Sequence, residues 1–253
     1  MKKILLIILV VNYICMLASG SIWGKWENWG SQPDKTYFNP VLPADFSDID
    51  CIRVRDDYYA ISSTFQYSPG MVILHSKNLV DWSIIGHAVT DIRQISPEMN
   101  WDRMDRYGRG IWAGSIRYHD RRFYVLFGTP DEGFFTTWAD EPTGPWSPLT
   151  NILPESGWDD CSAIWDDNGD AYFIGTLFRD RLYETYIFKM DPDCSSIDRS
   201  SAILVNKGGS REASKLIKVN DWYYLIYSRT GGGSRFVVAK RSRDINGPWS
   251  TEK

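Results

Sequence analysis

Residues 56–64 read DDYYAISST, a polar pair followed by two aromatic residues and a short apolar run. The same pattern returns as RRFYVLFGT (121–129), GDAYFIGT (169–176) and NDWYYLIYS (220–228). The first aromatic residues of the four runs are 65, 49 and 51 residues apart: Tyr58, Phe123, Tyr172 and Tyr223. A polar turn before a β-rich aromatic run predicts a hairpin, and a repeat of roughly 40–50 residues is typical of propellers and solenoids.

A tryptophan follows three of these runs at a similar distance. It comes 24, 23 and 26 residues after the first aromatic residue: Trp82, Trp146 and Trp249. The third unit instead reads MDPDCSSID at 190–198. No long stretch has a helical period, so the sequence predicts an all-β protein, a β-propeller with four-stranded blades in which these tryptophans are structural. A β-sandwich with coincidental aromatic spacing is the alternative.

Composition limits the possible partners. The chain has 28 Lys and Arg against 32 Asp and Glu, a formal net charge of -4, and no long basic run. We therefore expect no nucleic-acid partner. The 12 Trp and 14 Tyr are typical of strands pinned by aromatic side chains, of surfaces that stack on sugars or bases, or of both.

The amino terminus has the pattern of a secretory signal peptide. Lys2 and Lys3 precede an apolar run, and small residues follow at Ala18 and Gly20. The pattern predicts a signal peptide over residues 1–20, a lead-in over 21–38 and the propeller over 39–253. We expect a secreted or periplasmic protein without membrane association after cleavage. An uncleaved membrane anchor is the alternative.

Cysteine and histidine give no sign of a metal centre. The part after the signal peptide holds Cys51, Cys161 and Cys194, an odd number without C-x-x-C spacing, and the three histidines lie at no ligand spacing. We expect all three thiols to be small buried hydrophobic groups. Asp166–Asp170 is interpreted as a hairpin turn rather than a calcium loop, and Gly231–Gly233 as a hairpin loop rather than a phosphate site.

The repeat also predicts where a site would form. In a propeller the innermost strands line the central axis, so residues at equivalent positions near their starts meet at one mouth. Counting back 10 to 12 residues from each aromatic pair reaches Asp48, Trp112, Asp160 and Glu212. If the register is shifted by one or two residues, Asp50 and Asp159 replace the nearest of these. Three carboxylates and a tryptophan would suit metal coordination or acid and base catalysis on a glycosidic bond.

Four segments resemble glycoside hydrolase family 43, from about Asn39 to the last residue. They are NPVLPADFSDIDCIRVRDDYYAISSTFQYSPGMVILHSKNLVDW (39–82), GIWAGSIRYHDRRFYVLFGT (110–129), WDDCSAIWDDNGDAYFIGT (158–176) and REASKLIKVNDWYYLIYS (211–228). The resemblance implies a five-bladed propeller of which about four blades are present. It also implies a glycosidase that hydrolyses xylosidic or arabinosidic bonds with inversion. The expected substrates are oligosaccharides or polysaccharides such as plant xylan. No cofactor is expected to be required.

The resemblance assigns roles to the same carboxylates. The base falls on Asp48, the residue that tunes and orients the acid on Asp160, and the acid on Glu212. A third carboxylate beside the acid disfavours its ionisation. This sequence departs from the family pattern where Ser47, Ile49 and Cys161 replace prolines. The rings expected to contact substrate are Phe65, Trp101 and Trp112, with ordinary packing as the alternative for Phe65 and Trp101.

Other interpretations stay open at this point. A propeller that binds carbohydrate or docks proteins without catalysis is the main alternative to an enzyme. A retaining fructan enzyme is disfavoured, because Arg179-Asp180 is followed by Arg181 and no Glu-Cys pair occurs. The repeat would place a fifth aromatic pair near residue 274, so we expect a last blade beyond this chain, and we expect the chain alone to aggregate and to be poorly active. A structural calcium ion cannot be assigned.

Overall fold

The computed structural model describes residues 30–103, 105–179 and 182–253. The predicted signal peptide and the first part of the lead-in lie outside these residues. The chain divides into a smaller unit, residues 1–45 with 76–82, and a larger unit, residues 46–75 with 83–253. In the parts described, no helix is long and apolar enough to span a membrane. The helical segments there are two short 3-10 turns, η1 (Ile92–Gln94) and η2 (Pro97–Met99).

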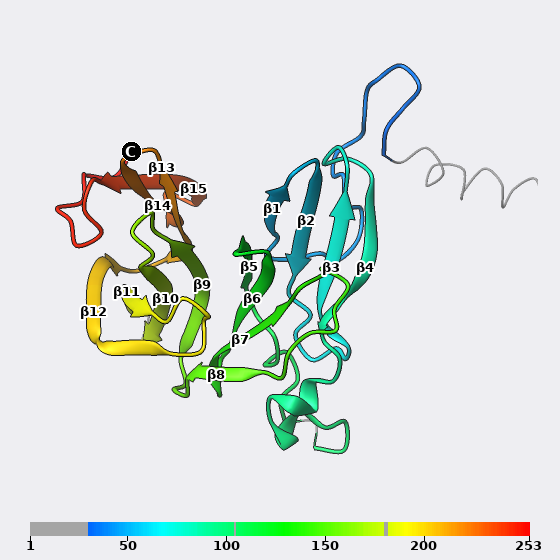
Figure 1. Ribbon diagram of the computed structural model, residues 1–253, viewed down its shortest axis with the longest axis horizontal. Helices are drawn as coiled ribbons and strands as arrows, with labels where there is room; N and C mark the ends of the chain where they lie inside the picture. The colour runs from blue at the N-terminus through cyan, green and yellow to red at the C-terminus, as the bar shows by residue number, and fades with distance from the viewer. Residues whose placement is uncertain (1–29, 104, 180–181) are drawn as a thin grey trace, which may run out of the picture. The chain divides into compact units, whose positions relative to one another are not determined.

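The described strands form four antiparallel sheets (Figure 1). The first contains β1 (Asp50–Val54), β2 (Asp57–Ser62), β3 (Gly70–Ser76) and β4 (Trp82–Val89), and the second β5 (Gly114–His119), β6 (Arg122–Thr129), β7 (Gly133–Ala139) and β8 (Thr150–Leu153). The third contains β9 (Trp158–Trp165), β10 (Ala171–Arg179), β11 (Leu182–Met190) and β12 (Ile197–Gly208), and the last β13 (Arg211–Val219), β14 (Trp222–Gly231) and β15 (Ser234–Ser242). Strands follow chain order in every sheet, which is the meander of a propeller blade. The predicted all-β propeller with about four blades is confirmed.

The aromatic pairs lie in the same place in each blade, on its second strand. Tyr59 faces Ile52 on β1, Tyr124 faces Arg117 on β5, and Tyr224 faces Ile217 on β13. Alternate side chains of these strands point to the two faces of a sheet, so one ring of each pair packs toward each neighbouring layer. The predicted hairpins are therefore the first turn of every blade.

Apolar side chains between neighbouring sheets form three separate core clusters. Ile61, Ile73, Ile116 and Phe127 belong to the cluster shared by the first two sheets. Leu126, Phe134, Cys161 and Phe173 belong to the cluster of the second and third sheets, and Ile174, Leu216, Leu225 and Tyr227 to that of the third and fourth. Half-buried Trp146 packs on the first cluster and Trp249 on the third. These two tryptophans are structural, as predicted.

Two loops with unusual sequences turn out to be hairpins. Asp166 N donates to Asp170 O at 2.7 Å, and Gly169 N donates to Asp166 O at 3.0 Å, which closes the turn between β9 and β10. Gly231 pairs with Ser234 across a loop of Gly232 and Gly233, whose φ angles are 58° and 79°. Two consecutive left-handed residues make a tight hairpin loop that glycine adopts without steric cost.

The smaller unit is organised around one carboxylate. Asp81 Oδ1 accepts a hydrogen bond from Ser31 N at 2.9 Å, and Asp81 Oδ2 accepts one from Asn78 Nδ2 at 2.7 Å. A Cβ at Gly30 would stand 2.4 Å from Asp81 Oδ1, so only glycine allows this close approach. Residues 30–45 thus join residues 76–82 through polar contacts rather than an apolar core.

Candidate active site

Near the start of three innermost strands, the backbone has a left-handed residue at the predicted carboxylate or directly after it. Asp48, Asp160 and Ala213 have φ angles of 55°, 55° and 58°. Asp160 and Ala213 lie where the ladder of their sheet slips, between the pairs Ile174–Ser162 and Thr176–Asp159 and between Glu212–Ser228 and Lys215–Ile226. Bulges of this kind redirect a side chain, and left-handed backbone at non-glycine residues concentrates at functional sites. Three blades therefore share a left-handed backbone residue at a predicted carboxylate or directly after it.

Asp48 is held by the end of β2. Ser63 Oγ donates to Asp48 Oδ2 at 2.5 Å, while Ser62 Oγ and Ser63 N donate to Ser47 O at 2.8 and 3.1 Å. The hydroxyl bond fixes the position of the Asp48 carboxyl group, with Oδ2 as the acceptor. A carboxyl group held in place in this way suits the role of a base.

Asp160 connects the other two carboxylates. Its Oδ2 accepts from Ala213 N at 2.7 Å, and Ala213 directly follows Glu212. Burial raises the pKa of Asp160, and the charges of Glu212 and Asp48 add to that rise, while the Ala213 N–H and Lys215 oppose it. The charges of Asp48 and Glu212 both affect the pKa of Asp160, so the three carboxyl groups lie close enough to interact electrostatically.

Asp159 is a second buried carboxyl beside this group. Among the described residues its Oδ1 has no hydrogen-bond partner. A Cβ at Gly128 would stand 3.2 Å from that oxygen, so the glycine leaves room for it. Burial and then the charge of Asp160 raise the pKa of Asp159 well above its usual value. The sequence marked Asp159 only as a possible register alternative, and its adjacency to Asp160 is the signal that could have identified it.

Glu212 has a cationic partner that the sequence did not indicate. Arg235 Nη2 lies 3.0 Å from Glu212 Oε2, with the arginine side chain 55% and the glutamate side chain 30% exposed. Arg235 belongs to β15, and its Nη1 also donates to Ser228 Oγ at 3.2 Å. Arg235 thus links the Glu212 carboxyl group to Ser228 on β14.

A charged cluster lies a few residues farther along the inner strands than the predicted site positions. Asp50 Oδ2 accepts from Arg117 Nη1 at 2.7 Å and from Ile116 N at 2.8 Å, and Lys215 Nζ lies 3.6 Å from Asp50 Oδ1. Arg117 Nη2 also donates to Ser162 Oγ at 2.6 Å. The cluster therefore joins the first strands of all four sheets.

The charges in this cluster decide its chemistry. Burial would raise the pKa of Asp50, but Arg117 and Lys215 together hold it below its usual value. Two cations surround one carboxylate, so these residues do not suit a divalent metal ion. No group of three or more His, Cys, Asp or Glu side chains in the described parts of the chain is arranged to hold a metal.

Two of the three predicted sugar-facing rings adjoin the carboxylates along the backbone. Phe65 comes two residues after Ser63, has a φ angle of 50° and pairs with Ile111 through two backbone bonds of 2.9 Å. Trp112 N donates to Gly128 O at 3.0 Å, which sets it beside the glycine that faces Asp159. Trp101 lies farther along the connection from β4 to β5 and is 81% exposed.

The three thiols do not all behave as expected. Cys161 and Cys194 are buried, and burial raises the pKa of each thiol. Cys51 is exposed, so its prediction as a buried residue was wrong. In β1 exposure alternates, and Cys51 falls on the open side while Asp50 falls on the buried side. Successive side chains of a strand point to opposite faces, which explains why Cys51 is exposed. The expectation of burial rested on residue type alone and did not consider this alternation.

Comparisons with known proteins agree with this geometry. The sequence profile of glycosyl hydrolases family 43 matches residues 37–253. The chain is 37% identical over 223 residues to a putative beta-xylosidase of Xylanibacter ruminicola, covering 88% of the chain and 40% of the relative. It is 31% identical over 233 residues to a non-reducing end alpha-L-arabinofuranosidase of Bacteroides ovatus, covering 89% and 42%. The chain belongs to glycosyl hydrolases family 43.

Solved structures of family 43 proteins also match the fold of this chain. A mutant of the family 43 protein BlXynB from Bacillus licheniformis matches with a TM-score of 0.71 at 31% identity, over 85% of this chain and 42% of that one. A xylan beta-1,4-xylosidase from Bacillus halodurans matches with a TM-score of 0.70 at 25% identity, over 83% and 42%. The chain spans about 40% of the length of the curated relatives it matches.

Proposed function

We propose that the protein is a glycosidase that hydrolyses β-xylosidic or α-L-arabinofuranosidic bonds with inversion. The observation that carries the proposal is the arrangement of Asp48, Asp160 and Glu212. They come from the first, third and fourth sheets, lie at or next to residues with left-handed φ angles, and the charges of Asp48 and Glu212 both act on Asp160. Relatives named as a beta-xylosidase and as an arabinofuranosidase support the two bond types.

The proposed reaction divides the work between two carboxyl groups. Glu212 gives its proton to the leaving glycosidic oxygen, and Asp48 takes a proton from the water that attacks the anomeric carbon from the opposite face. The C–O bond to the leaving group breaks as the bond to water oxygen forms. Asp160, bonded to the backbone next to Glu212, keeps the acid protonated and aimed, and no cofactor takes part in this scheme.

The substrate is proposed to be a xylose- or arabinose-containing oligosaccharide or polysaccharide of the plant cell wall. Phe65 and Trp112 are proposed to contact the sugar that is released, because they adjoin Ser63 and Gly128, the neighbours of the carboxylates. Aromatic faces with a few placed polar groups are the usual lining of such sites. We also propose export, which the pattern of residues 1–20 supports.

The test is hydrolysis of an aryl β-xyloside and an aryl α-L-arabinofuranoside by the protein as it is naturally produced. We expect turnover of at least one of them, and a loss of roughly 10²–10⁴-fold in Glu212→Gln, which cannot donate the proton. Glu141→Gln, in the exposed turn after β7, is the matched control and should keep full activity. Turnover of neither compound, with sugar binding intact, would instead favour a non-catalytic carbohydrate-binding propeller.

A further inference from the structure

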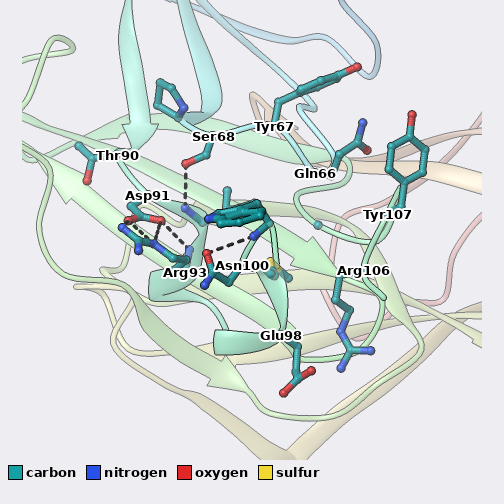
Figure 2. A pocket seen from close by; sticks show the side chains of 15 residues that line it. Gln66, Tyr67, Ser68, Thr90, Asp91, Arg93, Glu98, Asn100, Arg106 and Tyr107 are labelled. Carbon is teal, nitrogen blue, oxygen red and sulfur yellow. Dashed lines mark hydrogen bonds and ion pairs between the residues drawn. The ribbon is translucent and has the colours of Figure 1, made fainter. Parts of the chain in front are cut away.

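A cavity of about 530 Å³ lies in the larger unit, between two loops (Figure 2). One wall is the loop between β2 and β3, residues 66–69, and the other is the long connection from β4 to β5. Ser68 Oγ accepts from Ile92 N at 3.3 Å and ties the two walls together at one end. The volume is in the range of small-molecule sites.

Aromatic rings stand around this cavity with much of their surface in solvent. Trp101, Tyr67 and Tyr107 are 81%, 63% and 69% exposed, although all three line the cavity. Folding thus leaves a large aromatic area uncovered in one concave place, and such exposed patches mark binding sites. Rings of this kind offer flat apolar faces with polar edges, which complement the C–H faces and hydroxyl rims of sugars.

Amide side chains between the rings have donors available. Gln66 Oε1 accepts from Gly108 N at 3.1 Å, and Asn100 Oδ1 accepts from Trp101 N at 3.1 Å. Each amide oxygen is thereby fixed by backbone, and within the described residues neither NH₂ group has a partner. Oriented amide donors at the edge of an aromatic cavity suit hydroxyl acceptors.

The charged residues of the cavity are already paired. Arg93 Nε bonds Asp91 Oδ2 at 2.7 Å, and Arg106 Nε lies 3.3 Å from Glu132 Oε1. Glu98 lies 3.3 Å from Arg103. A charged ligand would have to compete with these pairs, whereas a neutral one would not. The cavity therefore favours an uncharged ligand.

The cavity shares its wall with the predicted sugar-facing rings. Trp112 Nε1 donates to Gly108 O at 2.8 Å, and Gly108 N is the donor to Gln66. Phe65 directly precedes Gln66 and pairs with Ile111. A Cβ at Gly110 would stand 1.9 Å from Phe65 O, so glycine is needed for these segments to meet. A chain of direct contacts thus runs from Trp112 and Phe65 to the cavity.

We propose that this cavity binds uncharged sugar residues of an oligosaccharide substrate beyond the residue that is released, with Trp101 and Tyr67 as stacking faces and Gln66 and Asn100 as donors. The inference rests on the proposed function and deepens it. The protein then prefers longer neutral substrates over small aryl glycosides. This preference can be measured separately from the catalytic step.

The test compares two substrates of different length. The ratio of kcat/KM on xylotetraose to kcat/KM on an aryl β-xyloside is measured for the parent, Trp101→Ala and Gln66→Ala. If the parent releases arabinose, arabinose-substituted xylotetraose and an aryl arabinofuranoside take their places. We expect the ratio to fall about tenfold in Trp101→Ala, the effect of losing one large apolar contact. Tyr118→Ala, at the far end of β5, is the control and should leave the ratio unchanged.

Calorimetric titration of xylotetraose into the Glu212→Gln protein supplies a readout that needs no turnover. We expect the Kd to rise about tenfold when Trp101→Ala is added. An unchanged Kd and an unchanged ratio in the variants would overturn the cavity assignment while the activity itself stood. A parent that binds xylotetraose through Trp101 but cleaves nothing would overturn the proposed function and leave the binding site in place.

Discussion

Asp50 and Asp159 are two carboxyl groups with the same 9% exposure and opposite electrostatics. Asp50 receives hydrogen bonds from Arg117 and from the backbone of Ile116, and its pKa is held below the usual value against the effect of burial. Asp159 has an unpartnered oxygen and Asp160 as its neighbour, and its pKa is raised. Burial is equal, so partners decide which carboxyl ionises.

The difference separates a structural centre from the proposed reactive one. At Asp50 one anion joins inner strands of four sheets and is flanked by two cations. At Asp159 and Asp160 two carboxyls are adjacent and near Asp48 and Glu212, an arrangement that disfavours full ionisation. Groups held in an unfavourable ionisation state mark reaction sites more often than structural ones.

The largest expected effect comes from breaking the paired centre. Asp50→Asn removes the anion that compensates Arg117 and Lys215, and we expect a loss of about 3–5 kcal/mol in the free energy of unfolding at pH 7, measured by urea denaturation. The control is Asp56→Asn in an exposed turn, whose pair with Arg53 spans 3.5 Å and should matter by less than about 1 kcal/mol. Equal losses in both variants would contradict the structural role.

The pH dependence of that loss has a definite sign. Because the pKa of Asp50 is lowered in the folded protein, its stabilisation is complete above the unfolded pKa, about 3.9, and disappears as pH falls through the folded value. The difference between parent and Asp50→Asn should therefore shrink below pH 4. A difference in the free energy of unfolding that grows as pH falls would contradict the stabilisation of ionised Asp50 by Arg117 and Lys215.

A smaller effect of opposite sign is expected at the unpaired carboxyl. The pKa of Asp159 is raised, so the stability that its protonation contributes is present below about pH 3.9 and is lost as pH rises through the folded value. Asp159→Asn cannot ionise, and we expect it to be about 1 kcal/mol more stable than the parent at pH 8, with a smaller gain at pH 4. Thermal unfolding at both pH values, with exposed Asp140→Asn as control, measures this. A variant less stable than the parent at pH 8 would refute the unpaired state.

The smallest effect concerns the contact between Glu212 and Arg235. Arg235→Met removes the side chain that lies 3.0 Å from Glu212 Oε2 and links it to Ser228. Because this contact is partly exposed, we expect kcat/KM on the aryl glycoside to fall by less than about tenfold, far less than in Glu212→Gln. Arg229→Met, whose partner is Glu252 at 3.3 Å, is the matched control on the preceding strand. A loss as large as that of Glu212→Gln would contradict a positioning role for Arg235.

The sequence predicted the repeating parts of the molecule better than the local ones. The aromatic pairs at Tyr58 and Tyr223 identified the second strand of their blades, because each pair follows the tight turn between the first two strands. Arg235 could not be foreseen as a partner of Glu212, since that contact depends on the register of β14 and β15 around Gly232 and Gly233. The repeat of aromatic pairs in the sequence predicts the fold. Which side chains contact one another depends on the register of the paired strands.

Two neighbours of the predicted residues show the same limit. Asp50 and Asp159 differ from Asp48 and Asp160 by one or two positions, and the sequence offered them only as alternatives. Asp48 and Asp160 have left-handed φ angles, whereas Asp50 follows the regular alternation of β1 that buries it. A left-handed φ angle at an aspartate cannot be predicted from a single sequence.

The most direct test of the assignment is proton NMR of the first sugar released from the aryl glycoside that the protein cleaves. A base that activates water opposite a protonating acid inverts the anomeric carbon. We predict that the first product carries the opposite anomeric configuration to the substrate and that mutarotation follows only later. A first product with the substrate's configuration would contradict the roles of Asp48 and Glu212.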